Sequence, residues 1–315
     1  MLFWMNTIDG FQLGLCYAIV AMGMYIAFAV LDFSDLSADG TFPLGGVIGT
    51  IIIYRLGLPP VLALVGGFLA GAIMGAVTGL LHVKFGISKL LSGIIVMTGL
   101  FSVNLALTML LTQNGFTITN FSYIVYHIEG LFNSFNPKPV VLSEWQVTLI
   151  LLAVVVVIKL LLDLFLKTKI GYLLRATGNN EALVTSLGKN VGTYKVLGLS
   201  LANGLVALGG ALYAQLTMNY DNTCGTGKVV LALASVIIGM SLFSKAKVVK
   251  STTAVIVGAI IYSLCLNYFT LLDTNGTYLK MMNAICFALI LIFNNRLKMH
   301  RILKDNHKTE RENKE

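Results

Sequence analysis

Residues 60–83 read PVLALVGGFLAGAIMGAVTGLLHV and contain no aspartate, glutamate, lysine or arginine. A run of about 20 mostly apolar residues is long enough for an α-helix to cross a bilayer. Similar runs occupy residues 10–31, 90–112, 146–166, 194–219, 229–244, 251–271 and 277–294. A shorter apolar piece, residues 44–58, is either a tilted short span or half of a broken helix. The sequence predicts an all-α fold, a polytopic membrane helical bundle with about 8–9 transmembrane helices, some of them broken.

The composition of the whole chain also indicates a membrane protein. Of its 315 residues, 57% are hydrophobic and 11% are charged, whereas a soluble domain carries about 25% charged residues. A water-soluble fold cannot bury that much apolar surface. The net charge of +8 comes from short clusters between apolar runs and from the tail. Because these charges form no basic face with interleaved aromatic residues, we expect no nucleic-acid partner.

Basic residues in short loops predict which side of the membrane is cytoplasmic. One side collects Lys84, Lys89, Lys167, Lys169, Arg175, Lys189, Lys195, Lys245, Lys247, Lys250 and the basic tail. The opposite side has only Lys138, Lys228 and Lys280, each accompanied by acidic residues. We expect a multi-pass protein of the plasma membrane, with a transmembrane domain at 1–295 and a cytoplasmic basic tail at 296–315. The side of the N-terminus depends on whether residues 44–58 cross.

Two sequence patterns concern the packing of the helices. Glycines recur at four-residue spacing in the 60–83 run, at Gly67, Gly71, Gly75 and Gly79. Such stripes let helix backbones approach closely in lipid, either inside one protomer or between two protomers. Lys159 and Asp163 lie four residues apart near the end of a span, and we expect them to pair locally.

A faint internal repeat joins the two halves of the chain. Residues 31–46 read LDFSDLSADGTFPLGG, and residues 209–228 read GGALYAQLTMNYDNTCGTGK. Both place acidic, small polar and glycine residues between apolar arms. Repeated halves with paired interruptions are typical of transport proteins, in which unwound helices build a site away from lipid.

Motifs of enzymes are missing from the sequence. Residues 224–230, CGTGKVV, look like part of a phosphate-binding loop, but Asn222 replaces its first glycine and Val229 cannot ligate magnesium. HExxH and GxSxG patterns do not occur, the four histidines are scattered, and the four cysteines lack CxxC spacing. We therefore predict no catalytic residue, no metal site and no enzyme activity in this chain.

A polar stretch interrupts the apolar runs at residues 170–195, IGYLLRATGNNEALVTSLGKNVGTYK. Asn179 or Asn180 can cap a short helix that begins near Glu181, and Gly188 or Asn190 can close it. Leu183, Val184 and Leu187 would give this cytoplasmic helix an apolar surface. Exposed apolar residues on such a helix indicate a partner that covers them.

This stretch resembles the cytoplasmic coupling loop of ABC importer permeases of the branched-chain amino acid and ribose type. The positions that match are Gly171, Ala176, Gly178, Asn180, Glu181, Ala182 and Gly188. Leu183 stands where many ABC permeases have a second alanine. The spacing to Gly188 is one residue longer than in the more widespread EAA-x3-G form of this loop. Residues 30–46 and GLVALGGALYAQ, residues 204–215, are also similar to family segments. The subgroup resembles Gram-positive uptake systems for amino acids, including aromatic ones.

The resemblance implies how the protein would work. Two permeases, expected to be identical, would enclose a path for a small polar solute, which we expect to be an amino acid. Two separate ATP-binding cassette subunits would hold ATP and magnesium and receive the coupling loop, residues 168–193. An external substrate-binding lipoprotein would deliver the solute. The outer loop, residues 113–145, is either its docking surface or a partly ordered lid.

The expected site residues form two sets. Coupling to the ATPase is assigned to Arg175, Gly178, Asn180, Glu181, Ala182 and Gly188. The pathway is assigned to Asp32, Ser34, Asp35, Asp39 and Asn104, although the aspartates could instead solvate a loop. A path-facing aspartate could meet the ammonium of an amino acid, and helix N-termini its carboxylate. Rival interpretations are a secondary transporter without an ATPase and a membrane scaffold without transport.

Overall fold

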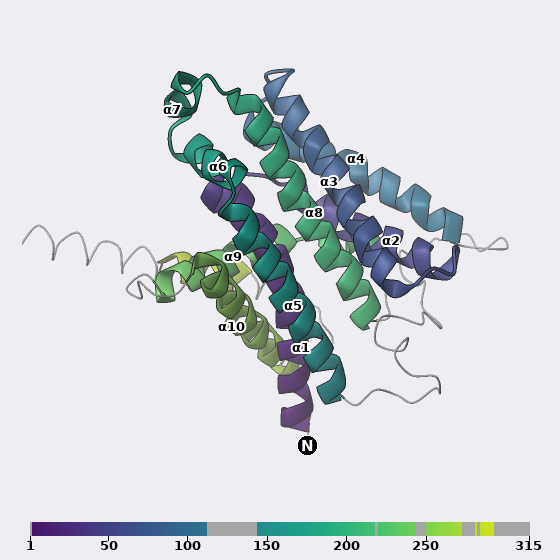
Figure 1. The fold of residues 1–315 in the computed structure, drawn as a ribbon. Helices are drawn as coiled ribbons and strands as arrows, with labels where there is room; N and C mark the ends of the chain where they lie inside the picture. Colours follow the sequence, from purple (N-terminus) through teal and green to yellow (C-terminus); the bar gives the residue numbers. More distant parts are fainter. Residues whose placement is uncertain are drawn as a thin grey trace, which may run out of the picture.

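The computed structural model describes residues 2–111, 144–217, 220–243, 250–272, 281 and 284–292 (Figure 1). Regular structure in these residues is helical throughout. Most of the outer loop at 113–145 and the whole tail at 296–315 lie outside the described residues. The elements are α1 (Leu2–Met24), the π-helix η1 (Tyr25–Val30), α2 (Ala38–Tyr54), α3 (Pro60–Val83), α4 (Lys89–Leu111), α5 (Glu144–Leu166), α6 (Lys169–Asn179), α7 (Glu181–Ser186), α8 (Val191–Thr217), the 3-10 helix η2 (Asn222–Gly225), α9 (Lys228–Leu242) and α10 (Ser251–Leu272).

The predicted polytopic helical bundle is confirmed. Seven of the described helical segments are long and apolar enough to cross a membrane, and α2 is a shorter apolar helix. The first span lies at the centre, because every residue from Gly14 to Ala27 is buried. Helices α5, α8, α9 and α10 pack around it. The first span thus forms the core, while the more apolar span in α5 is mostly exposed at the surface of the bundle.

One end of the bundle carries the basic loops, and we call it the basic end. The end of η1 packs against α6, since a Cβ on Gly178 would lie 3.0 Å from the carbonyl carbon of Leu31. The end of α3 meets the start of α8, where a Cβ on Gly79 would lie 2.8 Å from Val196 Cα. In Figure 1 this end, with α6 and α7, is at the top and the N-terminus is at the bottom. The lysine-rich turns therefore gather on the side opposite to the start of α1.

The first break turns the chain back into the bundle. After η1 reaches the basic end, residues 31–37 return inward without regular structure, and α2 begins beside Asn203 in the middle of α8. Helix α2 ends at the far end of the bundle, where Gln215 Nε2 donates to Pro60 O at 3.4 Å. Its 17 residues extend about 25 Å. Residues 44–54 of the apolar piece at 44–58 thus belong to a short helix that begins inside the bundle and ends opposite to the basic end.

The two halves of the chain have the same order of elements in opposite directions. In the first half a long helix, a break, the short α2 and the long α3 follow one another. In the second half α8, a break that includes residues 220–227, the short α9 and α10 do the same. Helix α3 packs along α8, and α10 packs along α1. Since α1 runs toward the basic end and α8 runs away from it, the halves form an inverted repeat.

The glycine stripe of α3 lies against α8 of the same chain. A Cβ on Gly67 would lie 3.0 Å from Ala211 Cβ, and one on Gly75 would lie 2.8 Å from Asn203 Cβ. Gly71 and Gly79 make equally close approaches to Ala207 and Val196. Because this face has no side chains, the two helix backbones can touch. The resulting van der Waals packing stabilises the helix pair in lipid, where there is no hydrophobic driving force for association.

Replacing Gly75 by leucine should destabilise the fold. The new side chain would meet the backbone of Leu199, which cannot move without separating α3 from α8. Overpacking of this kind costs about 1–3 kcal/mol or more. Thermal unfolding in detergent should show a lowered midpoint. The matched control is Gly99→Leu on α4, where a Cβ meets nothing within 4 Å; equal loss in both variants would contradict the packing argument.

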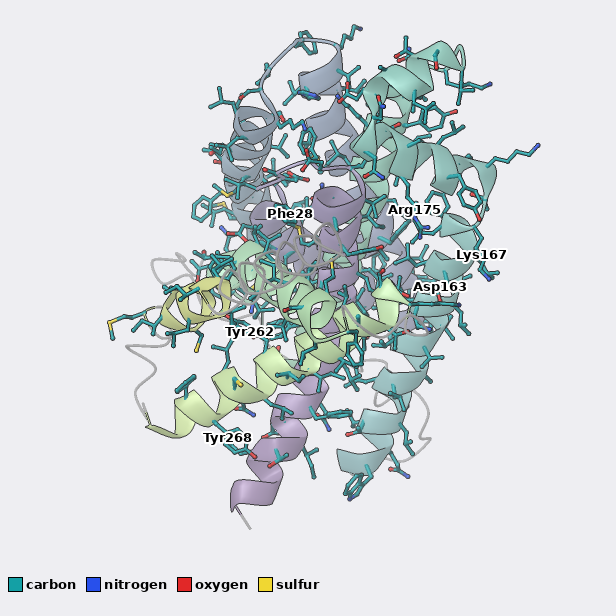
Figure 2. All side chains as sticks on the ribbon, turned by 90° about the vertical axis from the view of Figure 1, so that its left-hand side faces the viewer. Phe28, Asp163, Lys167, Arg175, Tyr262 and Tyr268 are labelled. Atoms are coloured by element: carbon teal, nitrogen blue, oxygen red, sulfur yellow. The ribbon has the colours of Figure 1, made fainter. Side chains whose placement is uncertain are left out.

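A charged cluster fixes the end of α5 to the start of α10. The predicted pair is confirmed, with Lys159 Nζ 3.4 Å from Asp163 Oδ2. The same carboxylate also accepts hydrogen bonds from Lys250 Nζ at 3.1 Å and from Thr252 Oγ1 at 2.6 Å. Figure 2 shows Asp163 below Lys167 and Arg175 along one side of the molecule. The cluster thus holds the second half against the helix that leads into α6.

Candidate functional site

A polar cluster is buried where the first break meets α8, and we call Asp35, Ser37, Thr41 and Asn203 the central polar cluster. Asp35 Oδ2 accepts a hydrogen bond from Asn203 Nδ2 at 2.6 Å, and Asp35 Oδ1 accepts one from Ser37 N at 2.8 Å. Asn203 Oδ1 accepts from Thr41 Oγ1 at 2.9 Å and from Ser37 Oγ at 3.1 Å. All four side chains are at most 2% exposed. The cluster fixes the returning segment to the middle of the bundle.

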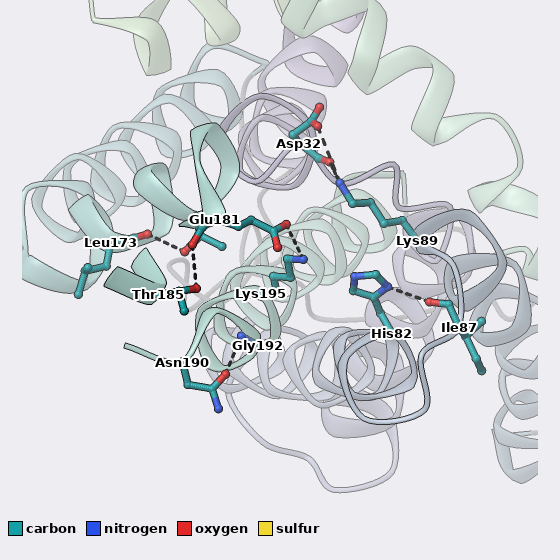
Figure 3. Close-up of polar contacts among 11 residues, drawn as sticks. Asp32, His82, Ile87, Lys89, Leu173, Glu181, Thr185, Asn190, Gly192 and Lys195 are labelled. Atoms are coloured by element: carbon teal, nitrogen blue, oxygen red, sulfur yellow. Dashed lines mark hydrogen bonds and ion pairs between the residues drawn. The ribbon is translucent and has the colours of Figure 1, made fainter. Parts of the chain in front are cut away.

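Asp32 and Ser34 do not join this cluster. Both are exposed, and Asp32 is the only non-glycine residue of the described chain with a positive φ, 51°. Lys89 Nζ lies 3.8 Å from Asp32 Oδ2 and donates to Asp32 O at 2.7 Å (Figure 3). Asp32 therefore lies at the basic end, where it helps to end η1, while Asp35 lies inside the bundle.

Asp39 links the two short helices. Its carboxylate accepts hydrogen bonds from Gly227 N at 3.0 Å and from Val229 N at 2.7 Å, the first turn of α9. The N-termini of α2 and α9 therefore meet inside the bundle, and a carboxylate offsets the positive ends of their dipoles. From the sequence we expected a helix N-terminus to bind the carboxylate of a solute. In the structure the N-terminus of α9 instead donates its hydrogen bonds to the carboxylate of Asp39.

Asn104 lies on the other side of the start of α2. It is fully buried in α4, and its Nδ2 donates to Gly40 O at 3.0 Å. Its Oδ1 has no hydrogen-bond partner among the described residues. The structure therefore places Asn104 beside α2 without joining it to Asp35.

The predicted position of Lys228 was wrong. The charge pattern placed it in an outer loop, but it is the first residue of α9 and its ammonium reaches into the bundle. Nζ donates to Tyr17 Oη at 2.7 Å. It also lies 4.3 Å from the ring centroid of Tyr17, 5.2 Å from that of Tyr213 and 5.4 Å from that of Phe42. We call Lys228 with these three aromatic residues the Lys228 box.

The polar stretch at the basic end forms two short helices, α6 and α7, as the capping pattern predicted for the second of them. Asn180 is the cap of α7, and its Oδ1 accepts from Leu183 N at 3.2 Å. Gly188 closes the helix with φ +68°, and Lys189 N donates to Val184 O at 3.2 Å. The positive φ favours glycine because other residues rarely adopt it.

The other coupling candidates lie on the surface of α6 and α7. Arg175 and Ala182 are exposed, and Figure 2 shows Arg175 at the edge of the molecule. Glu181 Oε1 lies 2.7 Å from Lys195 Nζ, which ties α7 to the start of α8 (Figure 3). Val184 is buried, whereas Leu183 and Leu187 are 50% and 59% exposed. Helix α7 therefore presents an apolar surface beyond the basic end.

Helix α6 connects α7 mechanically to the first break. Its buried face includes Leu174, and Gly178 touches Val30 and Leu31 at the end of η1. Leu31 is also enclosed by Gly198 of α8. Close contacts at glycine therefore join α6 to the segment that leads from Leu31 to Asp35.

Sequence reasoning missed Asn203, Ser37, Thr41 and the inward position of Lys228. A signal for Asn203 was present, because a polar side chain inside a transmembrane run is a functional candidate by default. The sequence indicated the inward position of Lys228 more weakly. The only indication was that Lys228 follows the second break directly, as the start of α2 follows the first break. The described residues contain no group of three or more His, Cys, Asp or Glu that could hold a metal.

Broken spans that carry buried polar groups define a multi-pass membrane protein built like a transporter. Residues 6–293 match the family described as branched-chain amino acid transport system / permease component. The chain belongs to this family and is a transport permease of the ABC type.

Similar proteins from other organisms agree with this family. The tyrosine transport system permease protein of Clostridioides difficile is 41% identical over 283 residues, covering 89% of this chain and 88% of the relative. The ribose import permease protein RbsC of Escherichia coli K12 is 25% identical over 279 residues, covering 89% and 82%. An uncharacterised Rickettsia prowazekii protein is 30% identical over 275 residues, covering 86% and 91%. No solved structure matches significantly.

Proposed function

We propose that this chain is the transmembrane subunit of an ATP-driven importer that forms the path for an amino acid. The family supports the importer, and the 41% identity to a tyrosine transport permease supports an amino acid as the solute. The solute would arrive from an external binding protein. Energy would come from separate subunits that bind ATP and magnesium, while this chain itself would hold no cofactor.

The observation that carries the proposal is the anchored helix α7. It is capped at both ends, extends beyond the bundle and exposes Leu183 and Leu187. Its base is fixed through α6 to the end of η1, which leads directly into the central polar cluster. A partner that binds α7 and moves would therefore move the break. Such a contiguous route through packed backbones is what mechanical coupling requires.

The proposed assembly contains two copies of this chain, each with one ATP-binding subunit beneath its α7. The basic end would face the cytoplasm, in accordance with the distribution of lysine and arginine. The start of α1 would then face outward, because it lies at the opposite end of the bundle (Figure 1). The C-terminus would be cytoplasmic, and the protein would reside in the plasma membrane.

Replacing Ala182 by tryptophan should abolish ATP-dependent uptake while the permease stays folded. Ala182 is exposed on α7, so the indole costs the isolated chain little, but it would overfill a groove shaped for alanine. Uptake by proteoliposomes that contain the ATP-binding subunits measures the loss. Thr185→Trp, also exposed on α7, shows whether the effect is specific to this position. Full activity of Ala182→Trp would contradict docking through this face.

The experiment that tests the function is co-purification with the ATP-binding subunits, followed by uptake of labelled amino acids into proteoliposomes. We expect uptake only when ATP, both types of subunit and a binding protein are present. Uptake by this chain alone, driven by a proton or sodium gradient, would instead show a secondary transporter. A complete lack of flux together with stable binding of another membrane protein would support a scaffold.

A further inference from the structure

The Lys228 box contains a cation whose charge the described residues do not pair. An ammonium group has three donor hydrogens, and Nζ gives one to Tyr17 Oη. The three ring faces around it are favourable for a cation. No carboxylate of the described residues lies within the 4.0 Å of an ion pair with Lys228. The Lys228 amino group therefore lies inside a membrane domain with hydrogen-bonding capacity left over.

The nearest acid is occupied in a different way. Asp39 uses both of its carboxylate oxygens to accept the backbone N–H groups of Gly227 and Val229. It thus lies beside Lys228 without pairing with it. A carboxylate oxygen accepts more than one hydrogen bond, so Asp39 keeps capacity for one further donor. One unpaired cation and one partly used anion therefore lie together at the meeting point of α2 and α9.

The box can be reached from the surface of the chain. Lys228, Gly227 and Tyr213 are partly exposed, and Thr226 is exposed. Gly227 adopts φ +82°, which turns the chain sharply into α9. Tyr17 and Tyr213 stack at 5.9 Å between ring centroids, and Phe42 packs against Tyr213 at 5.5 Å. Phe42 and Tyr17 are buried, so Tyr213 is the partly exposed ring beside the two charges.

We propose that Lys228 receives the α-carboxylate of the transported amino acid, while Asp39 faces its ammonium group and Tyr213 contacts an aromatic side chain. The inference rests on the proposed function, because it names where that solute binds. A zwitterion matches the two charges in sign and order. The carboxylate would take the donors that Tyr17 leaves free, and the ring of the solute would gain the offset contacts that aromatic groups prefer.

Binding to the purified full-length chain in lipid nanodiscs tests this assignment. The probes are L-tyrosine, tyramine, which lacks the carboxylate, 3-(4-hydroxyphenyl)propionate, which lacks the ammonium, and L-leucine. We expect L-tyrosine to bind best and tyramine to bind worst. Lys228→Gln should weaken L-tyrosine binding about 10- to 100-fold, as expected for loss of a charge-assisted hydrogen bond. Lys228→Arg should retain most of it.

Two control variants distinguish loss of the binding site from a general loss of folding or binding. Lys84→Gln removes an exposed lysine at the basic end and should bind L-tyrosine like the unchanged protein. Tyr213→Leu should reduce the preference for L-tyrosine over L-leucine, whereas Tyr194→Leu, at the start of α8, should not. Equal binding of tyramine and L-tyrosine, or unchanged binding by a folded Lys228→Gln variant, would overturn the assignment.

The proposed function and this site can fail independently. If the unchanged chain binds none of the probes at millimolar concentration, the site is wrong, but ATP-dependent uptake of an amino acid would still support the importer. If uptake never depends on ATP while L-tyrosine binding requires Lys228, the site stands and the importer does not.

Discussion

Replacing Asn203 by leucine is expected to cost about 3–5 kcal/mol of unfolding free energy, since each buried polar group left without a partner costs roughly 1–3 kcal/mol and a charged one more. The amide donates to Asp35 and accepts from Ser37 and Thr41. Leucine supplies none of these hydrogen bonds and leaves the buried Asp35 Oδ2 without its donor. Chemical unfolding in mild detergent, followed by helical circular dichroism, measures the loss.

The pair Asp35 and Asn203 offers a reciprocal control. Asn203→Asp alone places two carboxylates in contact and should destabilise the fold at neutral pH. Adding Asp35→Asn exchanges the amide and the carboxylate, so the same hydrogen bonds can form in the opposite sense. The double variant should therefore recover most of the stability. If the two losses instead add, the two residues do not form the cluster described above.

Replacing Gly178 by leucine is expected to lower ATP-dependent uptake about ten-fold or more, because coupling energies of 1–3 kcal/mol correspond to factors of about 5–150. A Cβ at this position would meet the carbonyl groups of Val30 and Leu31. The larger side chain would push α6 away from η1 and loosen the route from α7 to the first break. Uptake and ATP hydrolysis are measured in the same proteoliposomes.

The two rates should separate if α6 is the coupling element. Hydrolysis by the ATP-binding subunits should continue while uptake falls, because the ATPase would still close on a displaced α7. Asn179→Leu is the matched control, since Asn179 is exposed beside Gly178. A Gly178→Leu variant with normal uptake would show that the contact with η1 does not carry the movement. Unchanged thermal unfolding would exclude a merely unfolded protein.

Features that depend on neighbours along the chain could be predicted from the sequence. The apolar runs marked the spans, because the length of a membrane helix is set by bilayer thickness. The caps of α7 at Asn180 and Gly188 were predictable as well, since a cap is formed by residues within one helical turn. The interruptions at 31–46 and 209–228 were also visible as changes in composition.

The positions of Lys228 and of Asn203 could not be predicted in the same way. The charge pattern treats Lys228 as a loop residue, yet residues far away in the chain, Tyr17 and Phe42, provide its surroundings. Asn203 receives its partners from a segment more than 160 positions earlier. Asp32 and Asp35 look alike in the sequence, but only the return of the break into the bundle separates an exposed acid from a buried one.

The sequence by itself determined that this chain is a polytopic helical membrane protein with a capped helix in its polar stretch, because hydropathy and capping act over short distances. The permease family was indicated by the resemblance of that stretch to known coupling loops. The tertiary structure alone decided which polar groups meet, through the crossing of α2 with α8 and the joining of α2 and α9 at their N-termini. The reason is physical: a buried charge must find its hydrogen-bond partners in three dimensions, and these partners come from helices that the sequence keeps apart.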